Sequence, residues 1–283
     1  MLLLTRFPIE PEPRVFPAAR PQAAPLNDLG GLLSPSQVCT FRDCGAKWYY
    51  KYALGLPDPP NGSLVRGRVV HQMAEAFFRA KLEDGSPDPE DLQATFEEAW
   101  DTASVGAAFG ADEDVDLLKR QAAMLTRKYL DEVAPEIEPA ALELPVQGVI
   151  GGVAVRGFVD VLDTSGRVIE LKTAARKPTG VSADYTFQLA TYAKLCPGAN
   201  GKARVDTLVA TKSPQVVTQE YTVSPADLKM TEKLYPLVRE AMRDGIYLPN
   251  RSSNLCSYKH CAFAAVCEAE FGGRVKGGEE DLA

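Results

Sequence analysis

Hydrophobic positions along the chain change their period near residue 140. Before it, apolar residues recur with helical spacing, and after it they alternate with polar residues as in strands. A helix is expected over residues 64–82, and its core stripe falls at four helically spaced positions: Val70, Met73, Ala74 and Phe77. Another helix should begin at the cap Ser34 and run through Cys44 toward Tyr50.

Further elements follow from the same patterns and from turn residues. Four more helices are expected, over residues 92–100, 115–133, 182–195 and 224–243. Strands are expected over residues 143–150, 153–162, 168–173, 204–211 and 216–223. Gly151-Gly152 and the turn at 164–166 would join the first three strands, which predicts an antiparallel meander.

One large domain accounts for most of the chain. Residues 1–30 are rich in Pro and Ala and predict a flexible arm. Residues 31–271 would form the domain, with a helical insertion at about 85–138. Residues 272–283 are polar and predict a disordered tail.

Composition indicates a globular cytoplasmic protein. The cytoplasm would be that of a bacterium or, if the protein is phage-encoded, that of the phage's host. The 283 residues are 45% hydrophobic, enough for a core, and the apolar runs are too short for a membrane span or an export signal. The net charge of −7 lacks the overall basic footprint of a protein that coats duplex DNA. A nuclease remains compatible, because bound cations neutralise catalytic carboxylates.

Six cysteines in a cytoplasmic protein favour metal ligation over disulfides. Four of them lie at the two ends of the domain, and four thiolates can hold one metal centre. These are Cys44, Cys256, Cys261 and Cys267. A zinc site is the alternative to an iron-sulfur cluster, although paired C-x-x-C knuckles are absent. Cys196 is expected to be a buried free thiol.

Carboxylates in the central strands carry the candidate chemistry. Alternation in the strand Val168–Lys172 sends Glu170 and Lys172 to the same face, and Asp160 lies on the preceding hairpin strand. Such oxygen ligands suit Mg²⁺ or Mn²⁺, which would activate a water for phosphodiester hydrolysis. Taken alone, Glu-Leu-Lys is also what an ordinary amphipathic edge strand shows. The case depends on the joint order of several motifs.

That order resembles the RecB-like branch of the PD-(D/E)XK nuclease superfamily, from about Leu33 to Phe271. The matching segments are Gly67-Arg68-Val69-Val70-His71, Gly157-Phe158-Val159-Asp160, Ile169-Glu170-Leu171-Lys172 and Gln188-Leu189-Ala190-Thr191-Tyr192. The resemblance implies an α/β fold with a mixed central sheet flanked by helices. It also implies a metal site made of His71, Asp160, Glu170, the carbonyl of Leu171 and Lys172, with Gln188 and Tyr192 touching nucleic acid.

The cysteine pattern resembles the 4Fe-4S members of this branch, which include AddB-type nucleases, CRISPR-associated adaptation nucleases and phage homologues. The resemblance implies a cluster that staples the domain ends, near residues 39–48 and 254–268. Four residues separate Cys256 from Cys261 where the pattern has two, so Cys39 or His260 could replace Cys256 as a ligand.

The function implied is a divalent-metal-dependent DNA exonuclease that prefers single-stranded ends, in recombination and repair, phage DNA metabolism or CRISPR adaptation. Lys47, Trp48 and Lys51 could contact the strand, although Trp48 could equally be core. The stretch 196–203 lacks the spacing of a P-loop, so a helicase motor, like a CRISPR integrase, would be a separate partner. The alternative is a catalytically inactive DNA-binding scaffold with the same fold.

Overall fold

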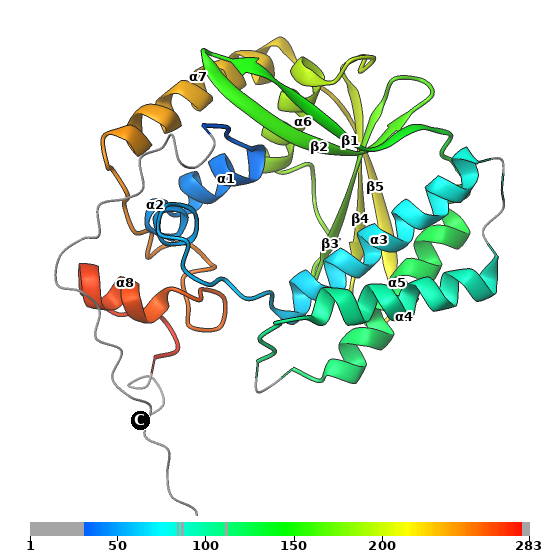
Figure 1. The fold of residues 1–283 in the computed structure, drawn as a ribbon, viewed down its shortest axis with the longest axis horizontal. Coiled ribbons are helices and arrows are strands. Elements are labelled where there is room, and N and C mark those ends of the chain that lie inside the picture. Colours follow the sequence, from blue (N-terminus) through cyan, green and yellow to red (C-terminus); the bar gives the residue numbers. More distant parts are fainter. Residues whose placement is uncertain (1–30, 84, 86–87, 111–112, 279–283) are drawn as a thin grey trace, which may run out of the picture.

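The computed structural model describes residues 31–278, except residues 84, 86–87 and 111–112 (Figure 1). The arm expected over residues 1–30 lies outside the described residues. Helices in the described chain are α1 (Pro35–Asp43), α2 (Gly45–Trp48), the π-helix η1 (Tyr49–Ala53), α3 (Gly62–Leu82), α4 (Pro89–Ser104), α5 (Val115–Glu132), the 3₁₀-helix η2 (Ala134–Glu136), α6 (Ala183–Leu195), α7 (Pro225–Arg243) and α8 (Ala264–Phe271).

Five strands form one mixed sheet in the order β1-β2-β3-β4-β5. They are β1 (Pro139–Ile150), β2 (Val153–Asp163), β3 (Val168–Ala174), β4 (Lys202–Val209) and β5 (Gln215–Thr222). The first three are the expected antiparallel meander, and α6 then carries the chain over so that β4 pairs parallel with β3. The expected α/β fold with a mixed sheet flanked by helices is confirmed.

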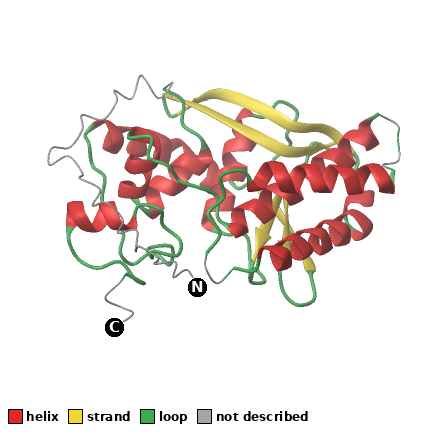
Figure 2. Cartoon of the chain, turned by 60° about the horizontal axis from the view of Figure 1, so that its bottom comes forward, coloured by secondary structure: helices red, strands yellow, loops and turns green. Residues whose placement is uncertain are grey.

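Helices cover both faces of this sheet (Figure 1). On one face α3 packs against β1 and β3 while α5 packs against β4 and β5, and on the other α6 and α7 pack against the meander. The β1–β2 hairpin is long and runs along one side of the molecule, as Figure 2 shows. Because the sheet is covered twice, β4 is almost continuously buried, as a strand in the parallel part of a sheet should be.

The helix expected from Ser34 through Cys44 is broken, which corrects the sequence-based expectation. Cys44 is extended, with φ −157° and ψ 106°, and separates α1 from α2. The reason lies at Gly45, where a Cβ would stand 2.9 Å from the backbone nitrogen of Leu248. The break therefore lets the segment around Leu248 pack directly on the chain, and Ala46 N donates to Leu248 O.

Residues 35–53 and 246–276 form a compact unit that we call the cysteine lobe. Aromatic rings fill it: Trp48 is 1% exposed and stacks on Tyr247, so it belongs to the core. Val275 is buried and Lys276 bridges to Ser257, so the first residues of the expected tail pack here. Within the described residues, no helix combines the length and apolar character that a membrane crossing requires.

Gly157 allows β2 to pack closely against α6. A Cβ at this position would lie 2.8 Å from Cε1 of Tyr192, whose ring is 3% exposed and has no room to retreat. We expect Gly157→Ala to lower the free energy of unfolding by about 1–3 kcal/mol through overpacking. Gly180→Ala is the control, because a Cβ there meets nothing within 4 Å. Equal urea midpoints for the two variants would contradict this account.

Candidate active site

Three carboxylates lie in one row across neighbouring strands of the sheet. In the β1–β2 hairpin Ile150 faces Val153, and the same register places Glu143 across from Asp160. Between β2 and β3 the pair Val161 and Ile169 places Asp160 across from Glu170. Because directly opposed residues of antiparallel strands project on the same face, the three side chains converge.

Helix α3 brings an imidazole to this row. Nδ1 of His71 lies 3.7 Å from Oδ2 of Asp160, and this oxygen accepts a hydrogen bond from Leu171 N at 2.8 Å. The ligand atoms of His71, Glu143 and Asp160 all lie within 4.8 Å of one another. A nitrogen and carboxylate oxygens at this spacing can share one divalent cation.

Glu170 is fixed at one oxygen and unpartnered at the other. Its Oε1 accepts from Lys172 Nζ and from Gln188 Nε2, the latter at 2.7 Å, while its Oε2 is buried without a hydrogen-bond partner in the described chain. Gln188 in turn donates to the hydroxyl of Tyr192 at 2.9 Å. A buried carboxylate oxygen without a partner is costly, and a cation would satisfy it.

Burial and mutual repulsion perturb these acids. Burial raises the pKa of Asp160 to about 6, and the charge of Glu143 adds to the rise. Burial, followed by the charge of Asp160, raises the pKa of Glu170 to about 7. Burial and Lys172 lower the pKa of His71, which keeps the imidazole neutral as a metal ligand must be. The site thus favours a bound cation when its acids are ionised.

Glu143 is the member of this site that sequence reasoning missed. Its φ of 42° is the one positive value of a non-glycine residue in the described chain. Such a backbone costs of order 1 kcal/mol or more and tends to occur where function fixes a side chain. A signal was present: counting eight residues outward on each side of the Gly151-Gly152 turn puts Glu143 opposite Asp160.

A cleft of about 800 Å³ opens over the row, between α3 and the end of β3. His71, Glu143, Asp160 and Lys172 line it, and so does the exposed Arg68. The residues of the first helices that were expected to contact a DNA strand do not line this cleft. Lys51 is paired with Asp58 at 2.7 Å, and Lys47 lines a cavity among the cysteines.

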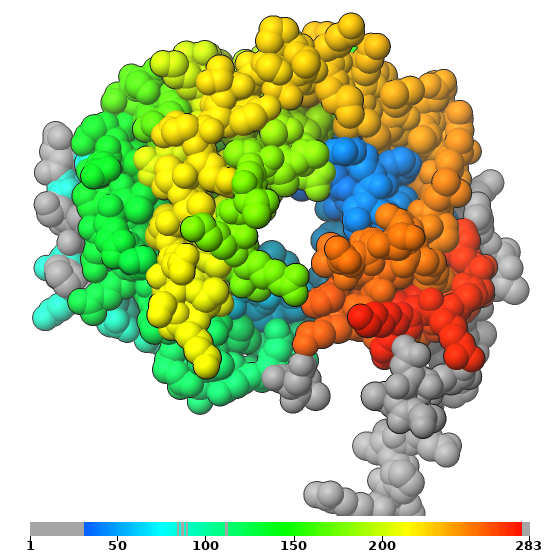
Figure 3. All heavy atoms as spheres, turned by 180° about the vertical axis from the view of Figure 1, so that it is seen from behind, coloured from blue at the N-terminus to red at the C-terminus, as the bar shows by residue number. Residues whose placement is uncertain are grey.

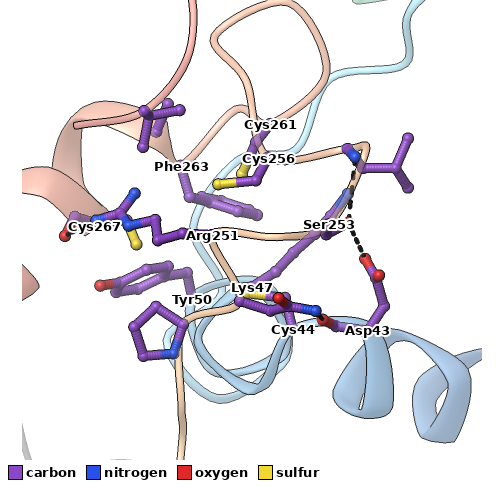
Figure 4. Close-up of a pocket in the computed structure, with 15 residues that line it drawn as sticks. Asp43, Cys44, Lys47, Tyr50, Arg251, Ser253, Cys256, Cys261, Phe263 and Cys267 are labelled. Atoms are coloured by element: carbon purple, nitrogen blue, oxygen red, sulfur yellow. Dashed lines mark hydrogen bonds between the residues drawn. The ribbon is translucent and has the colours of Figure 1, made fainter. Parts of the chain in front are cut away.

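All four cysteines expected as ligands line that second cavity (Figure 4). Cys44 comes from the break between α1 and α2, Cys256 and Cys261 come from the loop before α8, and Cys267 comes from α8. Three alternatives weighed from the sequence are not among the lining residues: Cys39, Cys196 and His260. Cys196 is a buried free thiol, as expected.

The cysteine cavity combines buried thiols with an arginine side chain. Burial raises the pKa of Cys267 to about 11, and the neighbouring cysteines add to it, so thiolates there need a cation. Arg251 reaches into the cavity (Figure 4), where its Nη1 is buried without a partner among the described residues while Nη2 donates to Cys267 O and Gly272 O.

Comparisons with known proteins agree with this geometry. The sequence profile of the PD-(D/E)XK nuclease superfamily matches residues 32–268. A crystal structure of a "Putative exonuclease" from Eubacterium rectale superposes with a TM-score of 0.56 at 13% identity, over 91% of this chain and 94% of that one. The crystal structure of SSO0001 gives a TM-score of only 0.37 at 14% identity, over 75% and 87%. No curated protein matches the chain significantly.

Glu143→Gln tests whether this carboxylate belongs to the metal site. Burial, with Glu75 and Glu170, raises the pKa of Glu143, and Glu143 raises that of Asp160. An acid whose pKa is raised on folding destabilises the fold as pH rises above its unfolded value. In EDTA at pH 8 we therefore expect Glu143→Gln to raise Tm, by roughly 2–4 °C for each kcal/mol relieved, and the gain to vanish near pH 4.

With Mn²⁺ in place of EDTA, we expect wild type to have a higher Tm than Glu143→Gln. Wild type gains stability from a bound ion, and the variant, lacking one ligand, gains less at the same concentration. Thermal unfolding with and without Mn²⁺ measures both effects. An identical manganese shift in the two proteins would remove Glu143 from the metal site.

Proposed function

This chain belongs to the PD-(D/E)XK nuclease superfamily, and we propose that it is a divalent-metal-dependent DNA exonuclease acting preferentially on single-stranded ends. Members of the superfamily hydrolyse phosphodiester bonds with divalent metals. The observation that carries the proposal is the row of Glu143, Asp160 and Glu170 beside His71 and Lys172. A degenerate scaffold would be expected to have lost at least one of these groups.

Mg²⁺ or Mn²⁺ would be held by His71, Glu143, Asp160, the free Oε2 of Glu170 and the carbonyl of Leu171. When bound, such an ion polarises a phosphoryl oxygen and lowers the pKa of an attacking water. Two hydrogen bonds fix the backbone of Leu171 beside the proposed metal. The N–H of Leu171 donates to Asp160, and the Leu171 backbone is also hydrogen bonded to the His71 ring.

Lys172 is the cation that the protein itself supplies. Burial alone would lower its pKa, but Glu170 and Asp160 raise it overall, so the ammonium stays protonated. It can orient the attacking water and stabilise negative charge that develops on the phosphoryl oxygens. Gln188 donates to Glu170 and to the hydroxyl of Tyr192, which is 3% exposed, so the proposed contact with the strand would fall to the half-buried Gln188.

The preference for single-stranded DNA is supported by the local charge. Although the chain carries a net charge of −7, Arg68 is exposed in the cleft, and Arg176 and Lys177 are exposed on the loop that follows β3. A few cations beside the metal site can neutralise the phosphates of one strand without the extended basic surface that a duplex needs.

We also propose a 4Fe-4S cluster bound by Cys44, Cys256, Cys261 and Cys267, as in the iron-sulfur RecB-like branch. In the described chain no three cysteine sulfurs lie within 4.8 Å of one another. A single tetrahedral zinc, with Zn–S bonds of about 2.3 Å, needs a closer set, whereas in a cluster each thiolate bonds a different iron. The unpartnered Arg251 Nη1 would face the negative charge of such a cluster.

A partner would decide the biological pathway. The described chain holds a nuclease site without a motor, so recombination or repair would require a separate helicase, and spacer trimming in CRISPR adaptation would require an integrase. A phage protein for DNA metabolism fits the same site.

Degradation of end-labelled single-stranded DNA tests the enzyme. With Mn²⁺ or Mg²⁺ we expect digestion by wild type, and a loss of at least about 100-fold for Glu170→Ala and Lys172→Ala. Glu132→Ala and Lys128→Ala are matched controls, since these residues form an exposed ion pair on α5. If cluster-loaded wild type leaves every substrate intact, the chain is a scaffold instead.

Iron analysis of anaerobically purified protein tests the cluster. We expect a brown wild type whose iron and colour are lost in Cys44→Ser and Cys267→Ser and retained in Cys196→Ser and Cys39→Ser. The lost cluster should also lower Tm, because it no longer links the two halves of the cysteine lobe, residues 35–53 and 246–276. Colourless protein containing zinc would establish the zinc alternative.

A further inference from the structure

Helix α6 turns one face toward the acids and the lysine of the active site. Tyr185, Gln188 and Tyr192 follow one another at intervals of three and four residues, so they share that face. Gln188 and Tyr192 are among the residues predicted for the site from the sequence, whereas Tyr185 is not. It lies in the first turn of the helix, where the Oγ of the cap Ser182 accepts a hydrogen bond from Tyr185 N at 3.3 Å.

The ring of Tyr185 faces the ammonium of Lys172. Nζ of Lys172 lies 5.1 Å from the ring centroid, and a cation within about 6 Å of an aromatic ring is attracted to its negative face. Two other lysines of the described chain make such a contact, Lys51 and Lys119, at the longer distances of 5.5 and 5.9 Å. Neither of them lines the cleft, so the contact with Tyr185 is the one that concerns the active site.

The glutamate and the lysine of the Glu-Leu-Lys triplet are therefore held by the same helix. Gln188 donates to Oε1 of Glu170 at 2.7 Å, and Tyr185, one turn earlier, contacts Lys172. Alternate residues of a strand are roughly 6.6 Å apart, and residues three apart on a helix have their Cβ atoms about 5–6 Å apart. The spacing along α6 thus matches the spacing along β3.

An aromatic ring holds a cation without neutralising it. Lys172 also pairs with Glu170, a carboxylate that we propose as a metal ligand, so a bound metal would compete for this partner. A further carboxylate in place of the ring would add negative charge to a site whose acids already repel one another. Asp184, the acid next to Tyr185, is instead paired with Arg42 at 3.2 Å. The ring is thus an uncharged support for the ammonium.

Tyr185 supports Lys172 from outside the cleft. Lys172 lines the cleft and Tyr185 does not, and the half-buried ring packs against the apolar cluster that contains Leu189. The Lys172 side chain is 22% exposed, and the loop 175–182 between β3 and α6 borders an opening in the molecule (Figure 3). Because water reaches the flexible lysine stem, it would populate several rotamers without the ring.

We propose that Tyr185 is a positioning residue, whose ring holds the Lys172 ammonium in the orientation that the reaction requires. The inference rests on the proposed nuclease function and adds to the site a residue that lies outside its motifs. Tyr185 acts through Lys172 and does not itself touch the phosphate or the metal. Because the contact is electrostatic, it should depend on the electron density of the ring and not on the phenol hydroxyl.

A series of ring substitutions at position 185 tests this role. Tyr185→Phe keeps the ring, phenylalanines with one, two or three fluorines at this position keep its shape while withdrawing electrons from its face, and Tyr185→Leu removes it. On single-stranded DNA with Mn²⁺ we expect kcat to change little in Tyr185→Phe, to fall stepwise with each fluorine, and to fall by roughly 5- to 30-fold in Tyr185→Leu. KM for the DNA should not change, because the ring does not contact it.

The same fluorinated series at Phe187 is the control. Phe187 lies on the same helix, and no lysine or arginine of the described chain lies over its ring. Activity there should not follow the number of fluorines, and Tm reports any loss of packing. A constant kcat along the series at position 185, or a fall that Phe187 reproduces, would overturn the positioning role. So would a loss in Tyr185→Phe as large as the loss in Tyr185→Leu.

A measurement without metal or DNA separates this inference from the nuclease. The ring should shift the NMR signal of the Lys172 ε-methylene upfield in wild type and in Tyr185→Phe but not in Tyr185→Leu, and Lys172→Arg assigns the signal. An unshifted signal in wild type would overturn the contact. A shifted signal in a protein that digests no DNA would refute the nuclease and leave the contact in place. Digestion with a constant kcat along the fluorine series would support the nuclease and refute the positioning role.

Discussion

Placing three acids side by side under a helix is the constraint on which the rest of the fold depends. Burial and mutual repulsion both oppose ionisation of Asp160 and Glu170, so the apo fold holds these groups in an unfavourable state. The surrounding structure must therefore be stable enough to impose it. A sheet covered on both faces by helices provides this stability, and the meander sets the spacing of the row.

The same constraint explains which carboxylate oxygens the protein itself holds by hydrogen bonds. Lys172 and Gln188 hold one oxygen of Glu170 and leave the other free, while Leu171 N holds one oxygen of Asp160. Each of these two carboxylates is thus oriented by the protein through one oxygen and still has an oxygen or a lone pair left for a cation. Orientation before binding reduces the entropy that a metal and a substrate must overcome.

Much of the sheet, its flanking helices and the motif residues could be predicted from the sequence, because alternation and capping are local signals. The ranges of α3, α5, α6 and α7 agree with the predicted ones within two residues at each end, while α4 extends beyond the predicted 92–100 at both ends. Two features depended on contacts between distant residues and were missed. The break at Cys44 is imposed by the backbone near Leu248, and the role of Glu143 comes from its register partner and its unusual φ. The hydrophobic periodicity of a single segment predicts neither the break nor the role of Glu143.

The cysteine lobe also determines when the protein can complete its folding. Its two halves, residues 35–53 and 246–276, are separated by about 200 residues that form the sheet and its helices, and such distant pairing is entropically slow. On the ribosome the first half must wait, with Trp48 and its neighbouring rings unpaired, until residues 246–276 have emerged. A chain that terminates before residue 246 contains every carboxylate of the site and still has no completed lobe.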